Sequence, residues 1–263
     1  MLSSARMHRI SFLSGSLALL LLQACSVPPP PDPKPPSPET RRAVLRKSAA
    51  VIVTDRQDIS GWAYRGFSVS QAPGDADGGS ATPISADGYL LTADHVLARE
   101  AGRNVFVLHG RNGRLTPTRA RVVWRSARAD LALLHIPAAT PDFYRWTPPE
   151  RWLPLGTPVM HGGVATGMRS DPGKLGTAIP PEGAFPGFHR FKIDIPLQPG
   201  DSGGPVVDAY GRLVGINSAV EFLVPMETAF FVDSEGNRPH IRSIEALIAA
   251  DRRGNSRRTP SVN

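Results

Sequence analysis

Cysteine is almost absent from this chain of 263 residues, which contains Cys25 and no other. A single cysteine cannot form an internal disulfide, so the sequence excludes the small secreted domains that disulfides hold together. Stability has to come from a hydrophobic core, and 41% hydrophobic residues in a chain of this length can form one large or two small domains. Histidine pairs with the helical spacing of a zinc site are also absent, so we predict neither a metal nor a cofactor.

Lysine is rare as well, because 4 of the 30 basic residues are lysine and the rest are arginine. The formal net charge of +7 could favour an anionic partner such as nucleic acid or an acidic envelope polymer. However, no stretch interleaves arginine with aromatic residues, which make up only 7% of the chain. We therefore interpret the charge as a solvated, arginine-rich surface and predict no nucleic-acid partner.

The apolar run near the start, residues 10–22, is too short to span a bilayer comfortably. It follows a basic segment with Arg6 and Arg9 and ends in LLQAC, whose last residue is Cys25, so residues 1–24 are typical of a signal peptide. LLQAC also resembles the lipobox of bacterial lipoproteins. The resemblance implies cleavage before Cys25, palmitate-type acylation of this cysteine, and anchoring in the envelope. Ser26 in place of Asp implies the outer membrane, facing the periplasm or the surface. A plain secretory signal with a chance cysteine is the alternative.

The segment after the signal is dominated by proline. The sequence VPPPPDPKPPSPET predicts an extended polyproline tether over residues 25–48. Short apolar runs bounded by Gly, Pro, Asp or Asn then predict an all-β domain over residues 49–253, divided into two halves at about 49–145 and 150–235. Apolar residues at helical spacing predict a C-terminal helix over 238–253, followed by a disordered tail over 254–263.

One glycine-rich stretch, QPGDSGGPVV at residues 198–207, is a poor strand and a worse helix. Such a run is usually only a tight turn, and its Ser202 would be a nucleophile only beside a base that a third group orients. His95, in GYLLTADHVLA, lies where a strand ends, and Asp130, in ARADLALLHI, precedes an apolar strand. The other histidines of the predicted domain are interpreted as structural: His109, His135, His161, His189 and His240.

These three segments, in the order His95, Asp130, Ser202, resemble the chymotrypsin-like serine proteases, and most closely their disulfide-free bacterial HtrA-type branch. The resemblance covers roughly residues 49–250. It implies two six-stranded antiparallel barrels with the site in the cleft between them. It also implies that Ser202 attacks the substrate, His95 takes its proton, and Asp130 orients His95. The backbone N–H groups of Gly200 and Ser202 would form the oxyanion hole.

The sequence departs from the HtrA pattern in two respects. Asp201 stands where HtrA relatives usually carry asparagine. In trypsin-type enzymes this aspartate pairs with a newly released N-terminus, which an acylated Cys25 would not provide. The sequence therefore does not identify the partner of Asp201. The chain also ends soon after the predicted helix, so no PDZ domain is expected.

Alignment on the nucleophile segment places the base of a specificity pocket at Pro196 and Leu197, and one wall at Ser218, Ala219 and Val220. No acidic residue lies at this base, and burying a substrate Arg or Lys unpaired is costly, which argues against cleavage after basic residues. Val220 stands where large-pocket relatives carry glycine, so the resemblance implies a narrow pocket and cleavage after small apolar residues. The leading hypothesis is an envelope-anchored serine endopeptidase with a protein or peptide substrate. The alternative is a catalytically silent lipoprotein of the same fold that binds protein or an anionic envelope polymer.

Overall fold

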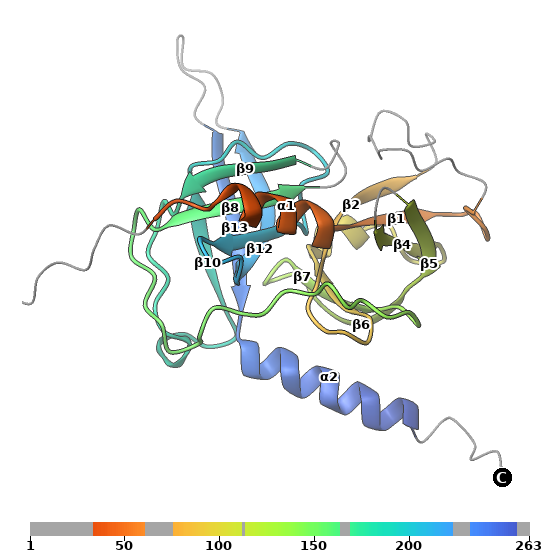
Figure 1. The fold of residues 1–263 in the computed structure, drawn as a ribbon. Coiled ribbons are helices and arrows are strands. Elements are labelled where there is room, and N and C mark those ends of the chain that lie inside the picture. Colours follow the sequence, from red (N-terminus) through yellow and green to blue (C-terminus); the bar gives the residue numbers. More distant parts are fainter. Residues whose placement is uncertain (1–33, 61–75, 112–113, 164–168, 223–231, 257–263) are drawn as a thin grey trace, which may run out of the picture. The chain divides into compact units, whose positions relative to one another are not determined.

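The computed structural model describes residues 34–60, 76–111, 114–163, 169–222 and 232–256 (Figure 1). The predicted signal, Cys25, residues 26–33 of the predicted tether and the short apolar run at 62–70 lie outside the described residues. Within the described residues, no helix is long and apolar enough to cross a membrane.

Two antiparallel sheets make up the body. The first has the order β5-β4-β1-β2-β3-β7-β6 and consists of β1 (Ala49–Thr54), β2 (Asp77–Pro83), β3 (Tyr89–Thr92), β4 (Asn104–Arg111), β5 (Arg114–Arg119), β6 (Arg121–Ser126) and β7 (Leu131–His135). The second has the order β10-β13-β12-β11-β8-β9 and consists of β8 (Pro158–Gly163), β9 (Arg169–Lys174), β10 (Phe188–Ile193), β11 (Pro205–Asp208), β12 (Leu213–Phe222) and β13 (Val232–Pro239).

The predicted all-β fold is confirmed, and the two sheets with a C-terminal helix fit a chymotrypsin-like double barrel. The first sheet has seven strands where six were expected. Two of them, β2 with the sequence DGGSATP and β5 with RLTPTR, carry too few apolar residues to be predicted from the sequence. Their strand conformation comes from pairing with β1 and β4, which are apolar and buried.

Each sheet encloses its own apolar core. Strands β1, β4 and β7 contribute Val51, Val107 and Leu134 to the first core, and β8, β10 and β12 contribute Val159, Phe191 and Val214 to the second. Burial of each such side chain stabilises the fold by about 1.5–3 kcal/mol. A further cluster joins residues of both sheets with the C-terminal helix and includes Tyr89, Leu133, Ile216 and Ile244.

The predicted tether is wrong over residues 38–47, because Pro38–Lys47 forms the helix α1. The helix begins where Ser37 Oγ accepts a hydrogen bond from the Thr40 backbone N–H (3.2 Å), with Pro38 at its first position. Val44 is fully buried, and its carbonyl accepts a hydrogen bond from Tyr144 Oη (3.1 Å). Figure 1 shows α1 beside β8, and a Cβ on Gly162 of β8 would lie 2.6 Å from Val44 Cγ1. The folded body therefore includes this helix.

The C-terminal helix α2 spans Ile241–Ser256, three residues later than predicted. Arg238 belongs to β13 and is only 2% exposed. Its guanidinium donates to Thr147 Oγ1 (2.6 Å) and to the Val214 carbonyl (2.8 Å), so strand contacts hold it ahead of the helix. The first three residues of the predicted tail, 254–256, are helical, and the rest lie outside the described residues.

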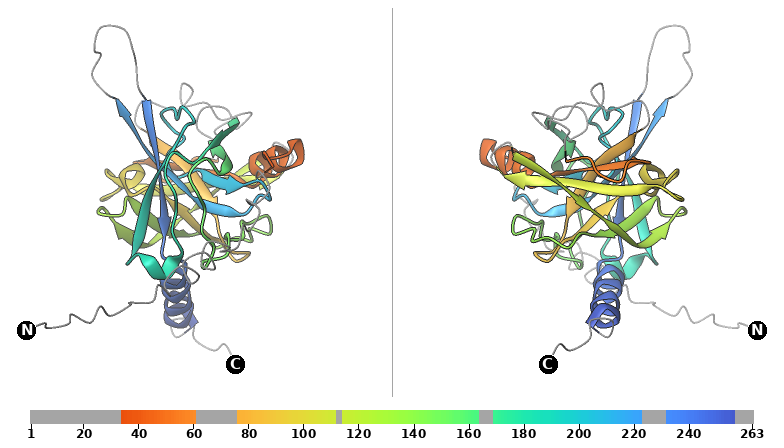
Figure 2. Two further views of the ribbon diagram at one scale, coloured as in Figure 1. Left: turned by 90° about the vertical axis from the view of Figure 1, so that its left-hand side faces the viewer. Right: turned by 90° about the vertical axis from the view of Figure 1, so that its right-hand side faces the viewer.

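The helix α2 lies below the two sheets in both views of Figure 2, and hydrogen bonds hold it near both of its ends. At its start, the buried carboxylate of Glu182, in the short helix η3 (Glu182–Ala184), accepts hydrogen bonds from the backbone N–H groups of Ile241 (3.0 Å) and Arg242 (3.2 Å). Near its end, Asp251 accepts a hydrogen bond from Tyr89 Oη of β3 (2.9 Å). The helix therefore starts at the second sheet and is fastened to the first.

Replacing Glu182 by alanine is expected to lower the free energy of unfolding by about 1–3 kcal/mol, because two backbone donors at the start of α2, the buried one of Ile241 and the partly buried one of Arg242, lose their acceptor. Urea unfolding measures the change. The matched control is Glu150→Ala at an exposed neighbouring site, which should change stability by less than about 0.5 kcal/mol. Identical unfolding curves for Glu182→Ala and the wild type would contradict the proposed capping.

Candidate active site

His95 and Asp130 form a directly hydrogen-bonded pair. His95 lies in the 3-10 helix η2 (Asp94–Leu97), immediately after β3, and Asp130 precedes β7, the neighbour of β3 in the sheet. His95 Nδ1 lies 3.0 Å from Asp130 Oδ1 and 2.9 Å from Oδ2, and the His95 backbone N–H also donates to Oδ1 (2.9 Å). A carboxylate only accepts, so Nδ1 carries a proton, and in the neutral ring Nε2 is free to accept one.

Hydrogen bonds hold Asp130 in a strained backbone conformation. Its φ of 46° is the only positive value among the described non-glycine residues, a conformation that costs about 1–3 kcal/mol. Ser218 Oγ donates to Asp130 Oδ2 (2.5 Å). Burial opposes ionisation of Asp130, but hydrogen bonds from His95 and Ser218 outweigh it and lower the pKa of the carboxyl group. Asp130 is therefore an ionised acceptor for both donors.

The loop of residues 198–204, which we call the nucleophile loop, needs glycine for its shape. Gly200 has a φ of +96° and Gly203 a φ of +86°, both in the left-handed region that favours glycine. A Cβ on Gly203 would lie 2.1 Å from the Ser80 carbonyl oxygen, so any side chain there would displace the loop from β2. This requirement explains a sequence that neither strand nor helix propensity favours.

The nucleophile loop is fastened to the first sheet although it belongs to the second half of the chain. The Ser80 backbone N–H donates to the Ser202 carbonyl (2.8 Å), and Ser80 Oγ donates to the Gly200 carbonyl (2.7 Å). Thr82 Oγ1 donates to the Gly203 carbonyl (2.9 Å). Because β2 is the neighbour of β3, which leads to His95, these bonds place Ser202 on the same part of the first sheet as the His95–Asp130 pair.

Ser202 Oγ donates to the Ser218 carbonyl (3.0 Å). The hydrogen bonds of the described residues do not include one between Ser202 and His95, a contact that often forms only with substrate in place. Ser218 therefore contacts Asp130 through its hydroxyl and Ser202 through its carbonyl. The sequence placed Ser218 only at the wall of a pocket, and nothing in its local pattern indicated this double contact.

The backbone N–H groups of the nucleophile loop divide into two sets. Those of Asp201, Gly203 and Gly204 donate to the carbonyls of Gln198 (2.9 Å), Asn217 (2.8 Å) and Asp201 (3.0 Å). Those of Gly200 and Ser202 donate to no group within the part of the chain that the structure describes. These two amides are therefore available to an incoming oxygen with negative charge, as an oxyanion hole requires.

Asp201 is completely buried beside Gly163. Its Oδ2 accepts a hydrogen bond from the Gln198 backbone N–H (2.9 Å), which ties the nucleophile loop to itself. A Cβ on Gly163 would lie 1.7 Å from Asp201 Oδ1, so the carboxylate fits only because residue 163 is glycine. One partner of Asp201, which the sequence left open, is thus the backbone of its own loop.

Two of the residues predicted to line the specificity pocket adjoin Ser234 of β13, whose Oγ accepts a hydrogen bond from the Leu197 backbone N–H (3.2 Å) and which pairs with Val220. The Leu197 side chain is 6% exposed and belongs to the core of the second sheet, and its place at the base of a pocket stays a prediction. Pro196 is exposed. Ala219 and Val220 continue β12, where Val220 pairs with Ser234, but their side chains lie outside the described part of the structure.

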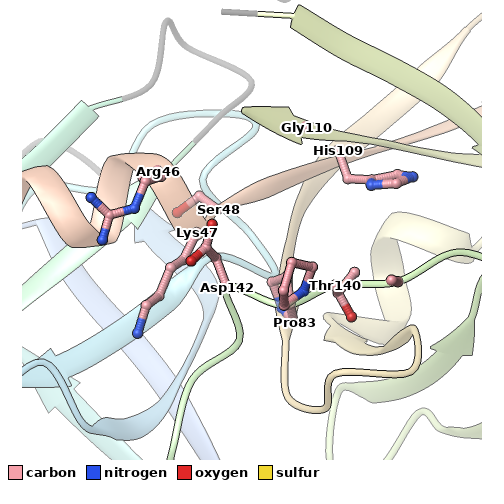
Figure 3. Close-up of a pocket in the computed structure, with 10 residues that line it drawn as sticks. Arg46, Lys47, Ser48, Pro83, His109, Gly110, Thr140 and Asp142 are labelled. Atoms are coloured by element: carbon pink, nitrogen blue, oxygen red, sulfur yellow. The ribbon is translucent and has the colours of Figure 1, made fainter. Parts of the chain in front are cut away.

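A cavity of about 390 Å³ lies elsewhere, between the end of α1 and the first sheet (Figure 3). Arg46 and Lys47 of α1 line it together with His109 of β4 and Asp142. None of the predicted site residues lines this cavity, so we do not assign the predicted catalytic role to it, although it is large.

The remaining histidines have structural partners. His109 Nε2 lies 2.9 Å from Thr118 Oγ1, His135 packs on Tyr89 with ring centres 4.6 Å apart, and His240 Nδ1 lies 3.0 Å from Glu182. His189 Nε2 donates to the Ala178 carbonyl (3.2 Å). The described residues contain no group of three or more His, Cys, Asp or Glu side chains that could hold a metal ion. His161 differs from the others because its Nδ1 lies 3.2 Å from the side chain of Asn217, a residue that contacts the nucleophile loop.

Comparison with known proteins gives a family and a fold. The family model of the trypsin-like peptidase domain matches residues 79–216, which is more than half of the chain. A probable periplasmic serine endoprotease, DegP-like, from Pseudomonas fluorescens is 30% identical over 174 residues, covering 60% of this chain and 34% of the relative. A protein of the same description from Bartonella henselae is 30% identical over 151 residues, covering 54% and 28%. The chain thus spans about a third of the length of these curated relatives.

Solved structures of the HtrA-type protease AlgW are similar in fold. The structure with a decapeptide has a TM-score of 0.56 and 21% identity, covering 80% of this chain and 66% of that one. The structure with a tripeptide has a TM-score of 0.57 and 24% identity, covering 83% and 65%. At these identities the likeness establishes the fold.

Proposed function

Because this chain belongs to the trypsin-like peptidase domain family, we propose that it is a serine endopeptidase with His95, Asp130 and Ser202 as its catalytic triad. The observation that carries the proposal is the contact between His95 Nδ1 and Asp130 (2.9 and 3.0 Å), with the Ser202 loop fastened to the adjoining strands. The DegP-like names of the relatives are consistent with this activity.

In the proposed reaction, Ser202 Oγ turns from the Ser218 carbonyl and attacks the carbonyl carbon of the scissile peptide bond. His95 Nε2 takes the Ser202 proton, and ionised Asp130 stabilises the imidazolium that forms. The Gly200 and Ser202 amides bind the oxygen of the tetrahedral intermediate, a contribution of about 10²–10³-fold in rate per donor. His95 then gives the proton to the leaving amine, and water hydrolyses the acyl-enzyme by the same steps.

The proposed substrate is a protein or peptide whose backbone pairs with residues 218–220 as an added strand. The titles of the AlgW structures record bound peptides for that protein. A small apolar residue before the cleaved bond remains the expected preference. A methylene more or less in such a pocket changes discrimination by only about 1–3 kcal/mol, so the preference should be broad.

We also propose that the domain is anchored in the bacterial envelope through lipid on Cys25. The sequence LLQAC and the word periplasmic in the names of the DegP-like relatives support this location. Metabolic labelling with an alkyne palmitate is expected to tag the wild type and not Cys25→Ser, with the wild type in the outer-membrane fraction. An untagged wild type would show that residues 1–24 act as a plain secretory signal.

Reaction with a fluorophosphonate probe tests the catalytic proposal. The probe phosphonylates an activated serine and is expected to attach to the peptide that contains Ser202, which mass spectrometry identifies. A catalytically silent binding protein of the same fold would not react. Absence of labelling on native, folded protein would therefore favour that alternative.

A further inference from the structure

Asn217 on β12 lies against the nucleophile loop and is fully buried. Its backbone accepts a hydrogen bond from the Gly203 N–H (2.8 Å) and donates one to the Gly204 carbonyl (2.8 Å). Its side-chain Nδ2 donates to the Asp201 carbonyl (3.2 Å). One residue therefore contacts the loop on both sides of Ser202.

The orientation of the Asn217 amide is fixed by its surroundings. Nδ2 lies 3.2 Å from the Asp201 carbonyl oxygen and 3.2 Å from the Gly162 carbonyl oxygen, and a turned amide would place Oδ1 against both. In the observed orientation, Oδ1 is buried with no hydrogen-bond partner among the described residues. A buried acceptor without a partner disfavours folding, so an apolar side chain would fill this space better. What distinguishes Asn217 is its capacity to donate.

His161 on β8 holds this orientation from the other side. It is fully buried, with Nδ1 3.2 Å from Asn217 Nδ2 and Nε2 3.4 Å from Asp171 Oδ2. An amide nitrogen only donates, so Nδ1 accepts and the ring proton lies on Nε2, toward the carboxylate. The neutral imidazole thus offers a third acceptor to the amide hydrogens of Asn217.

We propose that Asn217 is a positioning residue for the serine nucleophile, and that His161 acts through it by holding the amide in its donor orientation. The proposal rests on the function proposed above. Without the side-chain amide, the loop loses the hydrogen bond at the Asp201 carbonyl, next to Ser202. Ser202 Oγ and the backbone amides of Gly200 and Ser202 then shift. A displacement of about 1 Å can cost about 10²-fold in rate, whereas binding of a substrate strand along β12 is retained.

The test compares two buried asparagines on neighbouring strands. Asn217→Ala is expected to lower kcat by about 10- to 100-fold and to change KM by less than about twofold. The control is Asn237→Ala on β13, where Asn237 is equally buried, pairs with Ile216 and has no hydrogen-bond partner for its amide among the described residues. Its kcat should stay at the wild-type value. Asn217→Leu keeps the volume, removes the donor and should reproduce the loss if the alanine variant does not fold.

Two further variants separate positioning from general destabilisation. His161→Phe should lower kcat several-fold, and the double variant with Asn217→Ala should be no slower than Asn217→Ala alone, because both act on one contact. Unchanged kcat in the Asn217 variants, or an equal loss in Asn237→Ala, would overturn the proposal while the wild type still reacts with the fluorophosphonate probe. A wild type that does not react would overturn the proposed function and this inference with it.

Discussion

Replacing Ser202 by alanine is expected to lower kcat for peptide hydrolysis by about 10⁶-fold and to abolish fluorophosphonate labelling. The hydroxyl is the only group of the loop that can form the acyl-enzyme. Its removal takes away a single hydrogen bond, to the Ser218 carbonyl, so the fold should be retained. A peptide library profiled by mass spectrometry, with thermal unfolding alongside, measures both effects. Ser243→Ala, at an exposed serine of α2, is the matched control and should retain full activity.

A second variant tests whether Ser202 and His95 act as one unit. His95→Ala should lose about as much activity as Ser202→Ala, and the double variant should be no slower than either alone, because each step of the reaction needs both groups. Substantial residual turnover in Ser202→Ala, inhibited by the same probe, would show that another serine is the nucleophile.

Replacing Asp130 by asparagine is expected to lower kcat by about 10⁴-fold, with folding preserved. Asp130 Oδ1 accepts from the His95 backbone N–H, Oδ2 accepts from Ser218 Oγ, and both oxygens lie near His95 Nδ1. An amide has only one oxygen, so its NH₂ group faces a donor in either orientation. If the NH₂ group donates to Nδ1, the ring proton is forced onto Nε2, where it prevents uptake of the Ser202 proton.

The control for Asp130→Asn is Asp87→Asn, which removes the same charge at an exposed site where the carboxylate pairs with Arg252. Its kcat should be unchanged. Because hydrogen bonds from His95 and Ser218 lower the pKa of Asp130, its carboxylate stays ionised at a pH where an ordinary aspartate begins to take up a proton. If kcat of Asp130→Asn is as high as kcat of Asp87→Asn, the proposed role of Asp130 is contradicted.

The sequence by itself determined the segments that we propose to carry the chemistry. GDSGG around Ser202, the strand end before His95 and the apolar strand after Asp130 are local patterns, and each needs its own residues for a local reason. Gly203, for example, adopts a φ of +86°, which other residues rarely tolerate. Short β-branched runs likewise indicated the all-β fold, because strand periodicity can be read within a few residues.

The tertiary structure alone decided which other segments support these residues. The sequence of β2 contains two adjacent glycines, and Cβ atoms on Gly78 and Gly79 would lie 2.7 Å from the Val51 carbonyl oxygen and 2.6 Å from Val96 Cγ2. What looks like a loop is therefore a strand that neighbouring segments approach too closely for side chains. The same strand carries Ser80, which fastens the nucleophile loop.

Contacts between distant residues explain the other differences. Residues 38–47 form α1 because Val44 is buried under Tyr144, a hundred positions later, and Arg238 stays in β13 because Thr147 and Val214 accept its hydrogen bonds. Ser218 and Asn217 stand in a strand pattern that predicts only alternation of faces. Ser218 contacts Asp130 because the two sheets meet at this point, and Asn217 contacts the Asp201 carbonyl because the nucleophile loop lies against β12. Local propensity does not describe either contact, because both join residues that are well separated in the chain.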